Sequence, residues 1–384
     1  MAERLGLYAG ARPEPGALWL HAVSLGETRA AAPLVEALRA ARPDLRLLFT
    51  HSTATGREAG AGLLKPGDVQ AWLPYDTPGA VRRFLRHFKP AAGVLMETEV
   101  WPSLLLAAQQ ARVPMVLANA RLSMRSLDKG QRFQWLLQPA VRSLALVLAQ
   151  TEGDAQRLQA AGASAVKVCG NLKFDMSPSP VLLSRGQAWR DAVARPVVLA
   201  ASTREGEEVP LLQAWRRLSS PRPLLLLVPR HPQRFEEVAT AVLQGGFTLS
   251  RRSSWSEHPL EDACRSDVWL GDSMGEMPLY AGMADVALLG GSFAPLGGQN
   301  LIELAACGCP VVMGPHTFNF ADAAELALSA GAARRVADIE EGVECAVALS
   351  AADARKAWRR HALSFTQAHR GATDRMAKQV LSLL

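Results

Sequence analysis

Short apolar runs recur along the whole chain, and stretches with helical spacing separate them. Runs that are apolar at most positions, rather than at alternate ones, are typical of strands buried on both faces of a parallel sheet. Strands that alternate with helices predict an α/β protein. The expected strands are Leu18–Ser24, Leu45–Thr50, Gly93–Met96, Met115–Ala118, Leu144–Ala149, Val166–Cys169, Val197–Ala201, Leu224–Val228, Val268–Leu270, Val286–Leu289 and Val311–Met313.

The chain is expected to form two domains. With 384 residues it is too long for one ordinary core, and the strand–helix rhythm restarts after the linker Ser177–Pro180 (SPSP). Polar residues follow the strands, where open α/β sheets bind ligands. We therefore predict a GT-B-like plan with two Rossmann-type, doubly wound parallel-sheet domains that face a central cleft. Their bounds are residues 1–176 and 177–384, with the final helix able to cross back to the first domain.

One Rossmann dehydrogenase domain with a cap fits this pattern less well. The segment SLGE, Ser24–Glu27, opens no GxGxxG motif, and LGGSFAPLGG, Leu289–Gly298, lies too late in the chain.

The stretch Leu289–Pro315 has the pattern of a strand, a glycine-rich turn, a helix and another strand. Its glycines allow the backbone to pass close to a ligand. A turn that leads into a helix N-terminus presents unpaired N–H groups, which suit a phosphate. Glu303, one turn into the helix Gln299–Cys307, could accept hydrogen bonds from ribose hydroxyls, and Gly308 is expected to end that helix. A purely structural βαβ turn is the alternative.

Three helical stretches carry further expectations. Pro33 implies that the first helix starts near Ala30 or kinks there. In Val81–Lys89 an apolar face should pack on the core and leave a basic side in solvent, and contact with acyl chains and phosphates is the alternative. Arg125–Arg142 mixes aromatic and basic residues, so it is a second candidate for contacts with acyl chains and phosphates. Near the C-terminus we expect one helix around Ala323–Leu328 and another from Asp353 to the end.

Charge distinguishes the two halves of the chain. Residues 1–175 contain 21 lysines and arginines against 14 aspartates and glutamates, a net charge of +7, whereas the remainder has a net charge of −1. The first half should therefore face an anionic partner. Nucleic acid is not expected, because no nucleic-acid-binding motif accompanies the charge. The five cysteines form no CxxC pair, so we expect reduced thiols and no structural zinc.

Eight segments resemble those of a known family and occur in its order. The chain is similar to the transferases that move 3-deoxy-D-manno-octulosonic acid (Kdo) from CMP-Kdo to a lipid A precursor. The resemblance covers nearly the whole chain. The segments are HAVSLGE (His21–Glu27), LPYD (Leu73–Asp76), METEVWP (Met96–Pro102), NARLSMRS (Asn119–Ser126), NLKFD (Asn171–Asp175), VPRHPQRF (Val228–Phe235), GDSMGEMPLYAGMADVALLGGS (Gly271–Ser292) and MGPHTFNF (Met313–Phe320).

The resemblance implies a role for each matched residue. Glu27 corresponds to the general base, and Glu97 and Lys173 correspond to residues that stabilise the transition state. It implies an inverting glycosyltransferase that needs no cofactor and no metal, with CMP-Kdo as donor substrate and lipid IVA as acceptor. The residues implied for CMP binding are Pro229, Arg230, Met274, Gly275, Glu276, Asn300, Leu301, Ile302 and Glu303.

The family also implies a place in the cell. Its members act at the cytoplasmic face of the inner membrane and usually begin with an apolar anchor, whereas this chain starts at MAERLGLY. No apolar window approaches the length of a membrane span. We therefore expect peripheral attachment to an anionic membrane surface, without the anchor.

Several of these residues also suit purely structural roles. Glu27 at the start of a helix suits a helix-terminal charge, and Arg230 suits an interface salt bridge. The helix dipole would keep Glu27 ionised and lower its basicity, so desolvation must compensate if it acts as a base. Glu97 and Glu99 also suit a solvated, capped loop.

The whole chain is compatible with two further functions, a sugar-nucleotide epimerase and a non-catalytic nucleotide-sugar-binding protein.

His21, His231 and His316 are expected to be orienting or core residues rather than ligands.

Overall fold

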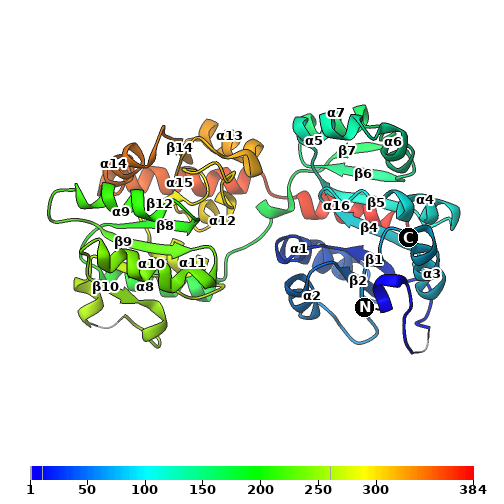
Figure 1. The fold of residues 1–384 in the computed structure, drawn as a ribbon, viewed down its shortest axis with the longest axis horizontal. Helices are drawn as coiled ribbons and strands as arrows, with labels where there is room; N and C mark the ends of the chain where they lie inside the picture. The colour runs from blue at the N-terminus through cyan, green and yellow to red at the C-terminus, as the bar shows by residue number, and fades with distance from the viewer. Residues whose placement is uncertain (1, 11, 260) are drawn as a thin grey trace. The chain divides into compact units, whose positions relative to one another are not determined.

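The structure is a computed structural model that describes residues 2–10, 12–259 and 261–384. The chain forms two compact units (Figure 1). Unit 1 comprises the residues up to Met176 together with His369–Leu384, and unit 2 comprises Ser177–Ala368. Each unit is built on one sheet of seven strands. The expectation of an α/β, GT-B-like chain with two doubly wound parallel sheets is confirmed.

In unit 1 all seven strands are parallel, in the order β3-β2-β1-β4-β5-β6-β7. The central strands are apolar at almost every position because helices cover both faces of the sheet. The strands are β1 (Leu18–His21), β2 (Leu47–His51), β3 (Val69–Trp72), β4 (Ala92–Met96), β5 (Met115–Ala120), β6 (Leu146–Ala149) and β7 (Val166–Val168).

Each face of this sheet has its own hydrophobic core. On one face Trp19 and Leu95 pack with residues of α3 and α4, and on the other Leu18 and Leu20 pack with residues of α1 and α16. The helices of unit 1 are α1 (Leu25–Ala41), α2 (Ala54–Ala61), α3 (Pro78–Phe88), α4 (Pro102–Gln110), α5 (Met124–Gln131), α6 (Gln134–Arg142), α7 (Glu152–Ala160) and α16 (Ala372–Leu381), with short 3-10 helices η1 (Ala2–Leu5) and η2 (Leu172–Phe174).

Unit 2 repeats the parallel plan with a different strand order, β10-β11-β9-β8-β12-β13-β14. Here β11 lies between β9 and β10, so chain order and spatial order differ on that side of the sheet. The strands are β8 (Val197–Thr203), β9 (Leu224–Pro229), β10 (Leu249–Arg251), β11 (Val268–Leu270), β12 (Val286–Leu289), β13 (Val311–Met313) and β14 (Ala333–Arg335).

The helices of unit 2 again alternate with the strands. Gly308 has φ +74° and follows the end of α12, so the expected stop of that helix is confirmed. The α-helices are α8 (Pro180–Ala192), α9 (Glu208–Arg216), α10 (Phe235–Gln244), α11 (Met277–Met283), α12 (Leu301–Ala306), α13 (Ala321–Ser329), α14 (Ile339–Leu349) and α15 (Ala352–Ala368), with 3-10 helices η3 (Pro232–Arg234), η4 (Arg252–Ser254), η5 (Glu261–Arg265) and η6 (Phe318–Phe320).

The last helix belongs to unit 1. Met376 and Val380 of α16 are fully buried in the core that contains residues of α1. The carboxylate of Asp175 accepts hydrogen bonds from the N–H groups of Gly371 and Thr373, each at 2.6 Å, and so caps the start of α16. The expectation of one helix from Asp353 to the C-terminus is therefore wrong, because the chain breaks at Gly371, where φ is +93°.

The start of α1 also differs from the expectation. The helix begins at Leu25, and Pro33 lies inside it. Ser24 caps this end with its side chain, so the cap fixes the start of the helix well before the proline. The expectation for α3 is confirmed, since Val81, Phe84 and Phe88 are buried.

Candidate active site

Glu27 lies shortly after β1, in the first turn of α1. Its backbone N–H donates to Ser24 Oγ at 3.3 Å, and its carboxylate accepts from Val23 N–H at 2.9 Å and from Ser24 Oγ at 3.2 Å. This reciprocal arrangement resembles a capping box, except that Glu27 accepts from the N–H of Val23 and not from that of the cap residue Ser24. The helix-terminal role of Glu27 is therefore present in the structure, and it fixes where the carboxylate points.

Glu97 is the first residue after β4 and is only 6% exposed. Its φ is +57°, a strained value for a residue with a side chain. Its carboxylate lies between two cations. Lys173 Nζ is 2.8 Å from Oε1, and Arg121 Nε is 3.3 Å from Oε2. The alternative of a solvated loop glutamate is wrong for Glu97, because a buried and paired carboxylate is not solvated.

A chain of amide side chains holds the segment that carries Lys173. Asn119, which has a left-handed backbone near the end of β5, accepts from Leu172 N–H at 3.0 Å. Gln150 donates to the carbonyl of Asn119 and accepts from Asn171 Nδ2, both at 2.9 Å, and Asn171 accepts from Lys173 N–H at 2.9 Å. Residues near the carboxyl ends of β5, β6 and β7 therefore fix the position of this lysine.

Neighbouring groups shift the pKa values of these glutamates in opposite directions. Burial, the largest cause, raises the pKa of Glu27, and the negative charge of Glu97 adds to this, while the hydrogen bond from Val23 opposes it. Burial also acts to raise the pKa of Glu97, but the ion pairs with Lys173 and Arg121 outweigh it, so this pKa lies below its usual range. The desolvation that a base at Glu27 requires is therefore already provided within unit 1.

Glu99 belongs to the same group, although the family resemblance assigns it no role. Its carboxylate accepts from Trp101 Nε1 at 2.8 Å. Burial, with the negative charge of Glu27, raises the pKa of Glu99 to about 7. Glu27, Glu97 and Glu99 thus form one electrostatically coupled group. The sequence METE could have indicated this role of Glu99. It places two glutamates directly after one buried strand, so both lie at the same end of that strand.

The CMP-site candidates Pro229 and Arg230 lie at the carboxyl edge of the sheet in unit 2. Pro229 is buried as the last residue of β9, whereas the side chain of Arg230 is exposed. The backbone N–H of Arg230 donates to the carbonyl of Thr203 at 3.0 Å. Within the described part of the chain its guanidinium forms no ion pair.

The candidates Met274, Gly275 and Glu276 form the turn after β11. Gly275 has φ +81°, and a Cβ there would meet open space. The side chain of Met274 is 54% exposed. The carboxylate of Glu276 pairs with Arg252 at 2.9 Å and accepts from Ser273 Oγ at 2.5 Å, so it ties this turn to the segment after β10.

The glycine-rich turn after β12 differs from the expectation. Glu207, which is 4% exposed, accepts hydrogen bonds from the N–H groups of Gly291 at 2.7 Å, Phe293 at 3.1 Å and Ala294 at 3.4 Å. Gly298 N–H donates to the carbonyl of Gly291 at 2.7 Å. The expectation that this turn presents unpaired N–H groups to a phosphate is therefore wrong at these positions, because an internal carboxylate and the turn itself use them.

The remaining candidates, Asn300–Glu303, start α12. Asn300 is its N-cap, and Asn300 Oδ1 accepts from Ile302 N–H at 3.2 Å. Leu301 and Ile302 are fully buried, so only their backbone groups can face a ligand, while Glu303 is half-buried. In the sheet β9 and β11 are neighbours, but β8 separates β9 from β12, so the three candidate segments follow strands that are not all adjacent.

Three further observations concern histidines, metals and membranes. His21 is fully buried and hydrogen-bonded to Thr50, as a core residue. Over residues 2–10, 12–259 and 261–384 the structure places no three His, Cys, Asp or Glu side chains together as a metal site. No helix in those ranges is both long enough and apolar enough to cross a bilayer.

Comparisons with known proteins agree with this architecture. A family described as 3-Deoxy-D-manno-octulosonic-acid transferase (kdotransferase) matches residues 1–176. The chain is 51% identical to the 3-deoxy-D-manno-octulosonic acid transferase of Bordetella pertussis over 96% of this chain and 88% of that protein. For the Haemophilus influenzae transferase the identity is 38%, over 83% and 76% of the two chains.

A solved structure supports the fold on independent grounds. The Anabaena protein Alr3699/HepE in complex with UDP matches with a TM-score of 0.64 and 16% identity, over 96% of this chain and all of that one. At this identity the likeness speaks for the two-unit fold alone. The identity to the Bordetella protein over nearly the whole length settles the relationship: the chain belongs to the family of 3-deoxy-D-manno-octulosonic acid transferases, which are glycosyltransferases.

Proposed function

We propose that this enzyme transfers Kdo from CMP-Kdo to a lipid A precursor, lipid IVA, with inversion at the anomeric carbon and without a metal. The observation that carries the proposal is the group at the strand ends of unit 1. Glu27 is a partly buried carboxylate with a raised pKa, and the ion pair of Glu97 with Lys173 acts on it electrostatically. A carboxylate of raised basicity beside fixed charges suits general base catalysis.

The proposed reaction has one bond-forming and one bond-breaking event. The acceptor hydroxyl oxygen forms a bond to the anomeric carbon of Kdo while the bond from that carbon to the CMP phosphate oxygen breaks. CMP leaves with the electron pair, and the hydroxyl proton passes to Glu27. Lys173, together with Glu97, contributes fixed charges that stabilise the charge that develops in this step. The ion pair between them, at 2.8 Å, keeps both groups oriented before substrate arrives.

We assign CMP binding to the strand ends of unit 2. The exposed guanidinium of Arg230 suits the phosphate or the carboxylate of the donor. Gly275 allows close approach because it has no side chain, and Met274 offers an exposed apolar surface beside it. The backbone groups at the start of α12 complete the proposed site, with Asn300 and Glu303 as its polar side chains.

A membrane-bound acceptor is supported by the surface of α5 and α6. No residue of α5 is buried, and large apolar side chains are exposed nearby, with Trp135 at 76% and Phe133 at 58%. Basic residues Arg125 and Lys129 lie on the same short segment. A surface that combines aromatic and basic side chains suits the boundary between acyl chains and phosphates. We propose that the enzyme is a peripheral protein at the cytoplasmic face of the inner membrane.

Release of CMP tests the proposal against its alternatives. The full chain is incubated with CMP-Kdo, with and without lipid IVA, and free CMP and the Kdo-lipid product are measured. We expect CMP release that depends on the acceptor and equals product formation. An epimerase of the same two-unit plan would change the sugar without transfer to lipid. A non-catalytic binding protein would bind CMP-Kdo and release no CMP under either condition.

A further inference from the structure

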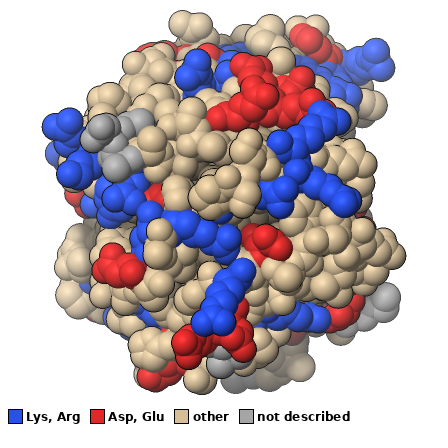
Figure 2. Space-filling model, turned by 90° about the vertical axis from the view of Figure 1, so that its left-hand side faces the viewer, with Lys and Arg blue, Asp and Glu red and all other residues tan. Residues whose placement is uncertain are grey.

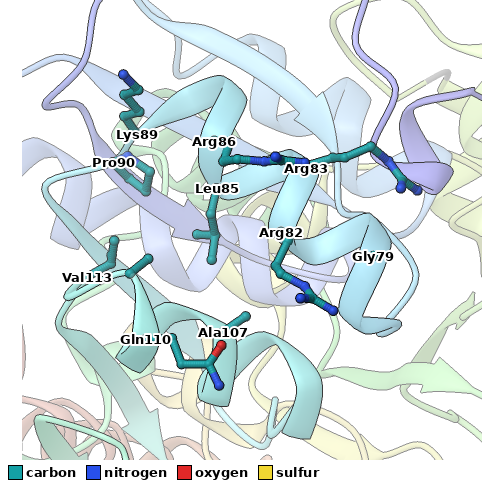
Figure 3. Close-up of a pocket in the computed structure, with 11 residues that line it drawn as sticks. Gly79, Arg82, Arg83, Leu85, Arg86, Lys89, Pro90, Ala107, Gln110 and Val113 are labelled. Carbon is teal, nitrogen blue, oxygen red and sulfur yellow. The ribbon is translucent and has the colours of Figure 1, made fainter.

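A basic groove lies in unit 1 between α3 and α4. It has a volume of about 730 Å³, within the range of small-molecule sites. Its polar wall comes from Arg82, Arg83, Arg86 and Lys89 of the α3 segment. Aliphatic residues, among them Leu85 and Ala107, form its floor, and Gln110 of α4 lines the opposite side. Figure 3 shows Leu85 pointing from α3 toward α4, with Arg82 and Gln110 extending into the space between the helices.

The four cations of this groove have no acidic partner in the described parts of the chain. Among the residues that the structure describes, none of them forms an ion pair, and the groove is lined by no aspartate or glutamate. Arg82 and Arg83 donate only to the carbonyls of Pro78 and Leu5. On the face that Figure 2 shows, basic and acidic side chains are interspersed. Four uncompensated cations around one concave surface attract an anion.

The helix dipole does not explain these residues. Cations in the last turn of a helix are favourable, which accounts for Arg86 and the adjacent Lys89. Arg82 and Arg83, however, lie in the middle of α3, before its last turn, where the dipole offers a cation no stabilisation. The residues of α4 that line the groove, Ala107 and Gln110, are uncharged, so this helix offers the cations no acidic partner.

The groove is separate from the group formed by Glu27, Glu97 and Glu99. Helices in this unit run back from the carboxyl ends of the strands, so the C-terminal ends of α3 and α4 lie at the amino edge of the sheet. Lys89, Pro90 and Val113 are at that edge, because β4 and β5 begin directly after them. Glu27 and Glu97 follow β1 and β4, at the carboxyl edge.

We propose that this groove binds the phosphate headgroup of an anionic lipid. The guanidinium and ammonium groups would hold the phosphate, as Arg and Lys commonly do. The aliphatic floor would accept the glycerol and the first carbons of the chains. The inference deepens the proposed function and rests on it, because it assigns the anionic membrane surface a defined site on this chain. It requires no catalytic residue to take part.

Vesicle binding by the full chain tests the assignment with a matched pair of variants. Gln110→Glu adds a negative charge inside the groove, and Gln109→Glu adds the same charge one position away on the same exposed end of α4, outside the lining. With phosphatidylcholine vesicles that contain phosphatidylglycerol, Gln110→Glu should lower the partition coefficient roughly fivefold, and Gln109→Glu less than about twofold. Arg82→Gln with Arg86→Gln should lower it roughly 30-fold.

The outcomes separate the possible ligands. If Gln110→Glu and Gln109→Glu lowered the partition coefficient equally, only the general charge of the surface would matter. That result would overturn the proposed lipid site. Saturable binding of glycerol phosphate alone, as tight as binding to vesicles, would make a free phosphate ester the ligand and overturn the lipid assignment. Binding of wild type to neutral vesicles as strongly as to anionic ones would also contradict it.

Turnover distinguishes this inference from the proposed function. With lipid IVA dispersed in detergent, Gln110→Glu should keep the wild-type rate of CMP release. A reduced rate under those conditions would place the groove in the acceptor site and overturn the separate lipid site. A wild-type enzyme that releases no CMP would refute the proposed function. The vesicle assay would still test the lipid site, because it does not depend on turnover.

Discussion

Both units place a buried glutamate at the carboxyl edge of a parallel sheet, but the two carboxylates have different partners. Glu97 in unit 1 contacts the side chains of Lys173 and Arg121, and the ion pairs lower its pKa despite burial. Glu207 in unit 2 accepts from backbone N–H groups, and burial still raises its pKa. Side-chain charges that are held in place can act on a substrate, whereas the backbone donors fix the shape of a turn. Unit 1 therefore suits chemistry at its strand ends, and unit 2 suits rigid binding.

The largest effect is expected for Glu27→Gln. The glutamine can still accept from Val23 N–H through its amide oxygen, but it cannot take a proton. Turnover should fall about 10²–10⁴-fold, the usual range for general base catalysis. Single-turnover rates, CMP affinity and thermal stability measured on this variant should show that only the rate changes. A variant that keeps most of its rate would remove Glu27 from the mechanism.

Glu207→Ala should mainly affect stability. It removes the acceptor of three N–H groups in the turn after β12 and of Arg204 N–H. Each buried donor left unpaired costs about 1–3 kcal/mol, so the free energy of unfolding should fall by about 3 kcal/mol or more. Denaturant unfolding measures the loss. The neighbouring Glu205→Ala, at an exposed side chain, is the control and should change it by less than about 0.5 kcal/mol.

Arg230→Ala should weaken CMP binding by about 1.5–3 kcal/mol, the range for a lost hydrogen bond to a charged group. Because Arg230 is exposed and forms no ion pair within the described residues, folding should be unaffected. Calorimetry with CMP gives the affinity. Arg217→Ala removes an exposed arginine paired with Glu340, and serves as the control. If both variants bound CMP like wild type, Arg230 would lie outside the nucleotide site.

The smallest effect concerns Glu99 and pH. Burial raises its pKa from 4.5 to about 7, so the folded protein holds a proton that the unfolded chain releases. The free energy that protonated Glu99 contributes to stability is fully present below 4.5, the pKa in the unfolded chain. It is lost as pH rises through about 7, the pKa in the folded protein. Glu99→Gln should therefore gain stability relative to wild type as pH rises from about 5 to 8. The gain should be about 1 kcal/mol, discounted for partial exposure. A constant difference between the two proteins would argue against the shift.

The sequence predicted the interior of both sheets but missed part of their edges. The central strands are apolar runs, and their burial on both faces makes the pattern unambiguous. By contrast, β3, β10 and β14 are edge strands with few buried residues, and no apolar run in the sequence predicts them. They form because a neighbouring strand offers hydrogen bonds, which is a tertiary effect that a local pattern does not contain.

The same distinction applies to the site. Glu27 was found because the segment SLGE that contains it resembles one in the family, and its contact with Ser24, three residues away, is local. Glu207 was missed because its main partners lie 84 to 87 residues away, and nothing local distinguishes it from Glu205 or Glu208. The pairing of Glu97 with Arg121 depends likewise on the order of β4 and β5 in the sheet.

The return of α16 to unit 1 has a consequence for biosynthesis. Its residues Met376 and Val380 complete a core whose members outside the C-terminal segment are all translated before Met176. A ribosome must therefore finish unit 2 before unit 1 can close that core, so the first part made is the last to mature. Until then the apolar surface of α1 stays open beside the nascent chain. Chaperones should bind stalled chains that end before Ala372 more strongly than full-length ones.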